Sequence, residues 1–264
     1  MRCGDLVSAS LFKVIISIGC LAIASYQDYK TREIDDRVWI FLGLIGGLLT
    51  VYELYTIWSP QLMILTPISI IVAFFVGLAM YKFGIMGGAD AKAIIALSIV
   101  HPYYPLVNFR PIYPYYPIFV LSILENSVLL SLFTLFYFVF RNIKLVLRGV
   151  KLFDRELPLI RKITLFLTAS RYDLMNTDWG KIYPIEFVDY SVDPPKVRYS
   201  FFSNVNVEVD VKNLIRGYKE GYLSNMIWGT YGLPMIIFMF VGFCFSILVG
   251  DIILGIIDLL FHVI

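Results

Sequence analysis

The stretch LMILTPISIIVAFFVGLAMY, residues Leu62–Tyr81, decides the fold class of this chain. It contains no charged side chain, and as a helix it would be about 30 Å long, which matches the hydrocarbon core of a bilayer. A helix satisfies its backbone hydrogen bonds internally, so it can cross that core where irregular chain cannot. The stretch therefore predicts a transmembrane helix.

Apolar stretches of the same kind lie on both sides of it. Hydrophobic residues make up 59% of the 264 residues and charged residues 16%, compared with about 45–50% and about 25% in soluble domains. The other predicted spans are Leu6–Tyr26, Val38–Trp58, Ala91–Val100, Ile118–Phe140 and Leu233–Ile257. The stretch Ala91–Val100 is too short to cross a flat bilayer by itself, unless its neighbours shield it or the membrane thins around it. We predict a polytopic α-helical membrane protein with six transmembrane helices, of which the fourth is short.

Residues 141–228 differ in composition from the predicted spans. They hold 14 of the 22 basic residues and 10 of the 20 acidic ones. Residues 142–172 are basic and amphipathic, which suits a helix on an anionic membrane surface. Alternating apolar residues predict short strands at 182–188, 196–202 and 205–211. We therefore predict a small α+β soluble domain at 141–228, between a membrane domain at 1–140 and a last span with the C-terminus at 229–264.

The distribution of Lys and Arg over the loops predicts the orientation, because cytoplasmic loops are enriched in both. With six spans, the soluble domain and the loops after the first and third spans fall on the same side. The basic residues in or beside those two loops are Lys30, Arg32, Arg37, Lys82 and Lys92, whereas the opposite loops hold only Arg110. We expect the soluble domain to be cytoplasmic and the N-terminus to lie outside.

Two aspartates lie where predicted spans meet the cytoplasmic face. Asp28 closes the first span, and Asp90 opens the fourth. Two carboxyl groups that share a proton do not both ionise, so one can draw a proton from water while the other hydrogen-bonds a scissile carbonyl. Ordinary structural roles are the alternatives. An aspartate at a helix start is most often an N-cap, and Asp28, beside Lys30 and Arg32, has the setting of a solvated interfacial charge.

The two segments resemble the motifs of the GxGD membrane aspartyl proteases, and within them the type IV prepilin peptidase group. The second motif of that group is typically Gly-x-Gly-Asp-x-Lys; here it is Gly87-Gly88-Ala89-Asp90-Ala91-Lys92, in which Ala89 replaces the last glycine. The first motif is an aspartate at the end of the first span, followed by a basic stretch and an Ile-Pro-Asn-like element, for which this chain has Ile34-Asp35-Asp36 after Asp28. Gly232-Leu233-Pro234 is similar to the late proline element of the family.

The resemblance is nearest to the archaeal preflagellin peptidases. It implies an aspartic-type endopeptidase that removes the short basic leader of preflagellins or type IV prepilin-like proteins at the cytoplasmic membrane face, while the hydrophobic helix of the substrate stays in the bilayer. It implies Asp28 and Asp90 as the catalytic pair. The motif residues that would support them are Gly87, Gly88, Ala89 and Lys92.

Bacterial members of the group commonly carry an early cytoplasmic domain with paired cysteines and an additional N-methyltransferase activity. Cys3, Cys20 and Cys244 form no such pair, and His101 and His262 are too few for most metal sites. We therefore expect protease activity alone, with no metal, no cofactor and no methyl donor. The net charge of +2 gives no indication of a nucleic-acid partner.

Two other classes of function are compatible with the sequence. Acids inside membrane spans mark functional sites by default, so Asp28, Asp90 and Glu125 would also fit a small proton- or cation-coupled transporter. The basic soluble domain would also fit a non-catalytic assembly protein of a filament or secretion system. Asp251, late in the last span, is expected near the outer interface.

Overall fold

The computed structural model describes residues 3–107, 111–180, 182–199, 207–232 and 234–262. The chain folds into two compact units. Unit 1 comprises Met1–Ser131 and Pro234–Ile264, and unit 2 comprises Leu132–Leu233. The predicted boundaries at 140 and 228 therefore differ by several residues from those of the compact units.

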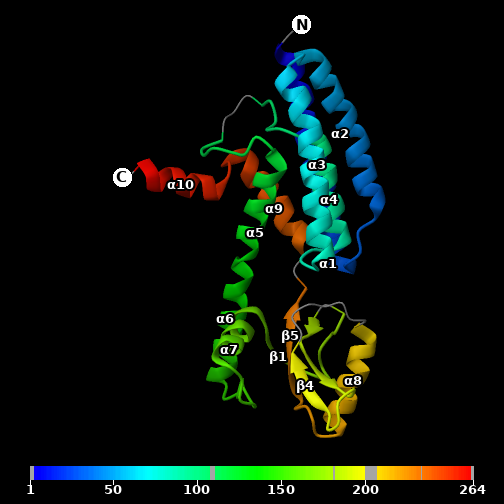
Figure 1. Cartoon of the computed structure of the whole chain (residues 1–264), viewed down its shortest axis with the longest axis vertical. Helices are drawn as coiled ribbons and strands as arrows, with labels where there is room; N and C mark the ends of the chain where they lie inside the picture. The colour runs from blue at the N-terminus through cyan, green and yellow to red at the C-terminus, as the bar shows by residue number, and fades with distance from the viewer. Residues whose placement is uncertain (1–2, 108–110, 181, 200–206, 233, 263–264) are drawn as a thin grey trace. The chain divides into compact units, whose positions relative to one another are not determined.

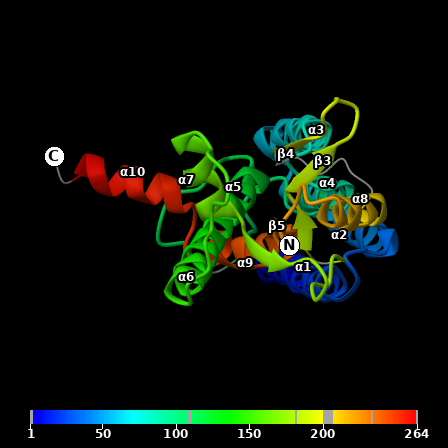
Figure 2. The same ribbon diagram turned by 90° about the horizontal axis from the view of Figure 1, so that it is seen from below.

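Unit 1 is a helical bundle. Its helices are α1 (Cys3–Thr31), α2 (Asp36–Ile57), α3 (Pro60–Lys82), α4 (Gly88–Val100), α5 (Phe119–Ser131), α9 (Met235–Leu248) and α10 (Ile252–His262). Helices α1 to α4 lie side by side, and α9 packs against both α1 and α5 (Figures 1 and 2). Helix α4 packs between α2 and α3, and 7 of its 13 residues are buried. The short helix is thus shielded by its neighbours, and its last side chain, Val100, is completely buried.

The described chain contains four helices long and apolar enough to cross a membrane, or five if one bent pair counts as a single span. Three of the four are Leu6–Thr31, Asp36–Ile57 and Pro60–Lys82, and the fourth is Phe119–Leu147, which combines α5 with α6 (Phe133–Leu147). The composition and these helices fit a multi-pass membrane protein. The number of crossings depends on α4 and on the bent pair, α9 and α10.

The predicted span Leu233–Ile257 is wrong as a single helix, because it is broken between α9 and α10 with a bend of 44°. Gly250 adopts φ +96 at the break, a conformation that glycine accepts readily. The backbone there bonds to another loop instead of continuing the helix. Tyr113 N–H donates to Val249 O at 2.7 Å, and Asp251 N–H donates to Pro114 O at 2.9 Å.

Unit 2 contains a small sheet and its covering helices. Its elements after α6 are α7 (Leu159–Thr168), β1 (Ser170–Asp173), β2 (Ile182–Pro184), β3 (Glu186–Asp189), β4 (Lys196–Tyr199), α8 (Val207–Lys219) and β5 (Met226–Tyr231). Strands β1, β5 and β2 form an antiparallel sheet in that order, and β3 pairs with β4. Helix α8 lies along the strands (Figure 1). The predicted small α+β domain is therefore present.

Two local predictions in unit 2 are wrong. Residues 205–211 were expected to form a strand, but α8 begins at Val207, and residues 205–206 lie outside the described chain. The alternating valines favour a strand locally, whereas Val211, Leu214 and Ile215 recur at helical spacing and pack together in the core. The expected amphipathic helix over 142–172 stops at Leu147, near Gly149 with φ +81, and gives way to a loop, α7 and β1.

Candidate active site

The last turn of α1 places Asp28 at the edge of unit 1. Its side chain is 13% exposed, and Nη1 of Arg32 lies 4.0 Å from its Oδ1. Helix α1 ends at Thr31, and Arg32 takes the left-handed conformation with φ 61, which directs the chain into the loop before α2. The backbone N–H of Ile236, in the first turn of α9, also interacts with the Asp28 carboxylate. The other carboxylate oxygen, Oδ2, is buried and has no hydrogen-bond partner in the described chain.

The first turn of α4 places Asp90. Gly87 is the N-cap of this helix, and its N–H donates to Asp90 Oδ2 at 2.9 Å. Asp90 is therefore not the N-cap, although one of its oxygens performs a capping role three residues into the helix. A Cβ atom at Gly87 would lie 3.3 Å from that same oxygen. The glycine thus leaves the half-buried carboxyl group room to turn.

The structure brings these two aspartates together. Asp28 is close enough to Asp90 to act on it electrostatically. No hydrogen bond joins the two carboxyl groups among the described residues. The pair therefore comes from opposite ends of two helices, the C-terminal turn of α1 and the N-terminal turn of α4.

Lys92 does not bind either aspartate. Its Nζ lies 2.6 Å and 2.7 Å from the two oxygens of Asp36, at the start of α2. Gln27 adds a second link, because its Oε1 accepts the N–H of Asp35 at 3.1 Å. The helix ends that carry Asp28 and Asp90 are thus both tied to the beginning of α2.

The remaining motif residues are near the pair. Pro234 is the N-cap of α9, so the late Gly-Leu-Pro element leads directly into the turn whose N–H faces Asp28; Leu233 lies outside the described residues. A Cβ atom at Gly88 would lie 3.6 Å from the ring of Tyr81, an ordinary contact. Ala89, which replaces the second glycine of the usual motif, is half-buried in the first turn of α4.

Two protein-family descriptions match the chain. Residues 15–140 match the "Type IV leader peptidase family", and residues 161–252 match "Archaeal Peptidase A24 C-terminus Type II". The chain belongs to the type IV leader peptidase family. Membership of this family makes leader-peptide processing its general function.

Similar members of the leader peptidase family come from archaea. A "Preflagellin peptidase" of Methanococcus voltae is 28% identical over 243 residues, which is 90% of this chain and 94% of that protein. One from Methanocaldococcus jannaschii is 26% identical over 254 residues, covering 92% and 95% of the two chains. One from Methanococcus maripaludis is 32% identical over 142 residues, covering 50% of this chain and 60% of that protein.

The other intramembrane acids of this family member lie away from the aspartate pair. Glu125 is half-buried and interacts with Asp251 and Tyr116. Asp251 is completely buried, and its Oδ1 accepts the N–H of Leu254 and caps α10. Helix α9 separates the two acid clusters by about 20 Å along its axis. The structure does not assemble Glu125 with the aspartate pair into one path.

A buried ion pair in unit 1 joins Lys13 and Glu53, two residues that the sequence analysis did not single out. Lys13 Nζ lies 2.5 Å from Glu53 Oε2, and the two side chains are 1% and 0% exposed. Ser10 donates to the other carboxylate oxygen at 2.7 Å, and Tyr103 donates to Oε2 at 3.1 Å. One feature of the sequence could have revealed this ion pair. Neighbouring antiparallel spans carry a lysine and a glutamate, each far from the predicted cytoplasmic end of its span.

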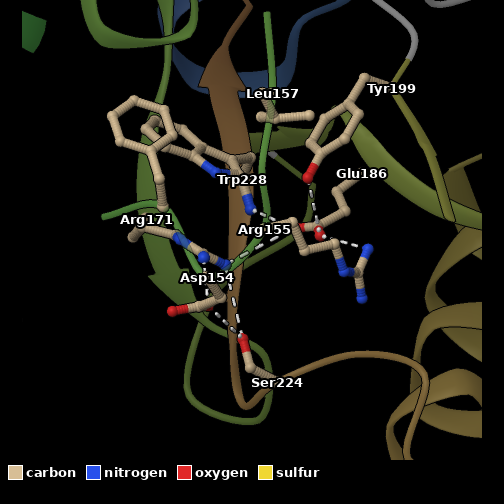
Figure 3. Close-up of a pocket in the computed structure, with 9 residues that line it drawn as sticks. Asp154, Arg155, Leu157, Arg171, Glu186, Tyr199, Ser224 and Trp228 are labelled. Carbon is tan, nitrogen blue, oxygen red and sulfur yellow. Dashed lines mark hydrogen bonds and ion pairs between the residues drawn. The ribbon is translucent and has the colours of Figure 1, made fainter. Parts of the chain in front are cut away.

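Unit 2 contains a polar cavity of about 40 Å³ (Figure 3). Arg171 and Glu186 are buried in its wall, where Arg171 also pairs with Asp154. Burial raises the pKa of Glu186, although Arg171 and Arg155 oppose the change. Because these charged groups are already paired with one another, we interpret the cluster as a structural connection between the sheet and the loop before α7.

Proposed function

We propose that this chain is a membrane aspartyl endopeptidase, and that Asp28 and Asp90 are its catalytic pair. The observation that carries the proposal is the position of these two half-buried carboxyl groups at helix ends, where Asp28 is near enough to act on Asp90 electrostatically. Coupled carboxyl groups titrate as a pair, so one proton is shared over a range of pH. This is the state that aspartic proteolysis requires.

The reaction then follows from the pair. The ionised carboxylate takes a proton from water, whose oxygen attacks the carbonyl carbon of the scissile peptide bond. The protonated carboxyl group transfers its proton to the carbonyl oxygen, giving a neutral gem-diol. When the C–N bond breaks, the leaving nitrogen takes the proton that came from water, and a gem-diol hydroxyl returns a proton to the second carboxyl group.

The proposed substrate is a preflagellin or type IV prepilin-like protein with a short basic leader before a hydrophobic helix. The printed names of the three relatives support a preflagellin substrate. The substrate helix would remain in the bilayer, and its leader would reach the helix ends that carry the aspartates. Asp35 caps α2 and Asp36 is paired with Lys92, so both of these acidic side chains are already engaged within the chain.

We propose six crossings with the site and unit 2 on the cytoplasmic side. In this count, α4 is a short crossing shielded by its neighbours, and the bent α9–α10 pair is the last crossing. All the basic loops then fall on one side of the membrane. Residues 141–228 carry 14 of the 22 basic residues. Without the crossing at α4, the same rule would be violated by this large basic segment.

Replacing each aspartate by asparagine tests the catalytic assignment, because the shape is kept and the ionisable group is lost. Membranes containing each variant are mixed with a leader-bearing preprotein, and cleavage is followed by gel shift. We expect Asp28→Asn and Asp90→Asn each to lower the rate at least about 100-fold.

Asp251→Asn is the matched control, because an asparagine oxygen can also accept the Leu254 N–H, and it should retain cleavage. Thermal unfolding of each variant checks that its fold is intact. Cleavage at an ordinary rate by either Asp28→Asn or Asp90→Asn would refute the pair.

A further inference from the structure

Unit 2 carries an exposed surface that is both apolar and basic, formed by the end of α6, the following loop and α7. Its apolar side chains are exposed by 82%, 73%, 74% and 46% at Leu147, Leu159, Ile160 and Ile163, respectively. Its exposed basic side chains are Lys144, Arg148, Lys151 and Arg161. We call these eight residues the α6–α7 surface.

The outward direction of these apolar side chains is fixed by packing. Asn142 of α6 donates to the carbonyl oxygens of Phe166 and Ala169, at 2.8 Å and 2.7 Å, which holds α7 against α6. Leu165 is completely buried in the core beside Trp228. Since Leu165 fixes the inner face of α7, Ile160 and Ile163 are left on its outer side.

The basic side chains of this surface differ from four arginines elsewhere in unit 2. Among the described residues, none of the four forms an ion pair with a carboxylate. In contrast, Arg155, Arg171, Arg198 and Arg216 are each paired with a carboxylate of their own unit. The α6–α7 surface thus presents uncompensated positive charge next to exposed apolar side chains.

The position of this surface along the chain indicates what it meets. The candidate span Phe119–Leu147 has 29 residues and is about 43 Å long, whereas the hydrocarbon core is about 30 Å thick. After Glu125 it carries no charged side chain until Arg141, and Lys144 and Arg148 follow. The last turns of α6, with α7 held beside them, therefore reach the level of the lipid headgroups.

We propose that the α6–α7 surface is an interfacial anchor that binds anionic lipid headgroups. Its apolar side chains enter the boundary between headgroups and acyl chains, and its basic side chains contact lipid phosphates. This role is separate from the peptidase chemistry, because it uses neither aspartate. It fixes unit 2 at the membrane surface next to the span from which it emerges.

The test uses the full chain with Cys3→Ser, Cys20→Ala and Cys244→Ala, labelled with a fluorophore at Ile160→Cys. The protein is reconstituted into vesicles of phosphatidylcholine with phosphatidylglycerol, or of phosphatidylcholine alone. Brominated acyl chains quench a label in the lipid, and aqueous iodide quenches a label in water. The matched control is Lys219→Cys at the exposed end of α8, which does not pack on α7.

In anionic vesicles, we expect bromolipid to quench the label at position 160 and iodide to quench the label at position 219. Replacing Lys144, Arg148 and Arg161 by glutamine should shift position 160 towards iodide quenching. Each lost charge should lower the ratio of lipid-contacting to water-exposed label about fivefold. Because all three residues are exposed, the thermal midpoint should stay that of the parent.

Two results would overturn the proposal. One is iodide quenching at position 160 equal to that at position 219 in anionic vesicles. The other is self-quenching between labels at position 160 of two copies without bromolipid quenching, which would identify the surface as a contact between copies of this chain.

Discussion

Replacing Glu53 by glutamine tests the buried ion pair that connects α1 to α2. The substitution keeps the size of the side chain and one acceptor oxygen, but removes the negative charge beside Lys13. The Lys13 ammonium would retain Thr50 Oγ1 at 3.3 Å as a neutral partner. The distance of 2.5 Å and the exposures of 1% and 0% place this pair among fully buried ones.

The expected cost follows from that burial. Removing one partner of a buried ion pair costs about 3–5 kcal/mol, because the other charge remains desolvated. A neutral hydrogen bond between membrane helices contributes only about 0.6 kcal/mol on average. We therefore expect Glu53→Gln to lower the free energy of unfolding by about 3 kcal/mol or more. The double variant Lys13→Met with Glu53→Gln removes both charges and should recover most of this loss.

The measurement is reversible unfolding in mixed detergent micelles with increasing dodecyl sulfate, followed by tryptophan fluorescence. Trp39, which is 5% exposed in the core of unit 1, reports on this bundle. A loss below about 1 kcal/mol for Glu53→Gln would show that the pair behaves as a neutral hydrogen bond. A double variant as unstable as the sum of the two single variants would also refute the argument.

Two further predictions concern helix packing and pH. A Cβ atom at Gly242 would lie 2.3 Å from Ser127 Oγ and 2.9 Å from its backbone nitrogen, so Gly242→Ala should destabilise the α5–α9 contact by about 1–3 kcal/mol in the same assay. Gly19→Ala, which has open space around the new atom, should cost nothing. Because burial raises the pKa of Glu186 above its ordinary value of 4.5, the stability it contributes is complete below that pH and is lost as pH rises through the folded pKa. Glu186→Gln should therefore gain thermal stability relative to the unchanged chain as pH rises from 4.5 towards neutrality, and a constant difference across that range would contradict the sign.

Much of the membrane architecture is readable from local sequence. Leu62–Tyr81 lies within α3 because an uncharged apolar run of this length is stable in a bilayer only as a helix. Asp28 and Asp90 were located at helix ends for the same reason, since each follows or precedes an apolar run. The family motif depends on a few consecutive residues, so it too was visible in the chain.

Unit 2 was less predictable because its elements are short and its strands depend on distant partners. Strand β5 was missed, and it pairs with β1 and β2 far along the sequence. The valines of 205–211 fit a strand locally, yet the packing of Leu214 selected a helix for α8. Alternating apolar residues indicate only that one side of a segment is apolar. The elements that pack against the segment decide whether a strand or a helix buries that side.

The sequence by itself determined that this chain crosses a membrane and where its two motif aspartates fall along the helices. Only the tertiary structure decided that the end of α1 lies within electrostatic reach of the start of α4, that Lys13 pairs with Glu53, and that the last apolar run breaks at Gly250. The physical reason is that hydropathy adds up along one segment, whereas these three features depend on how closely separate segments approach.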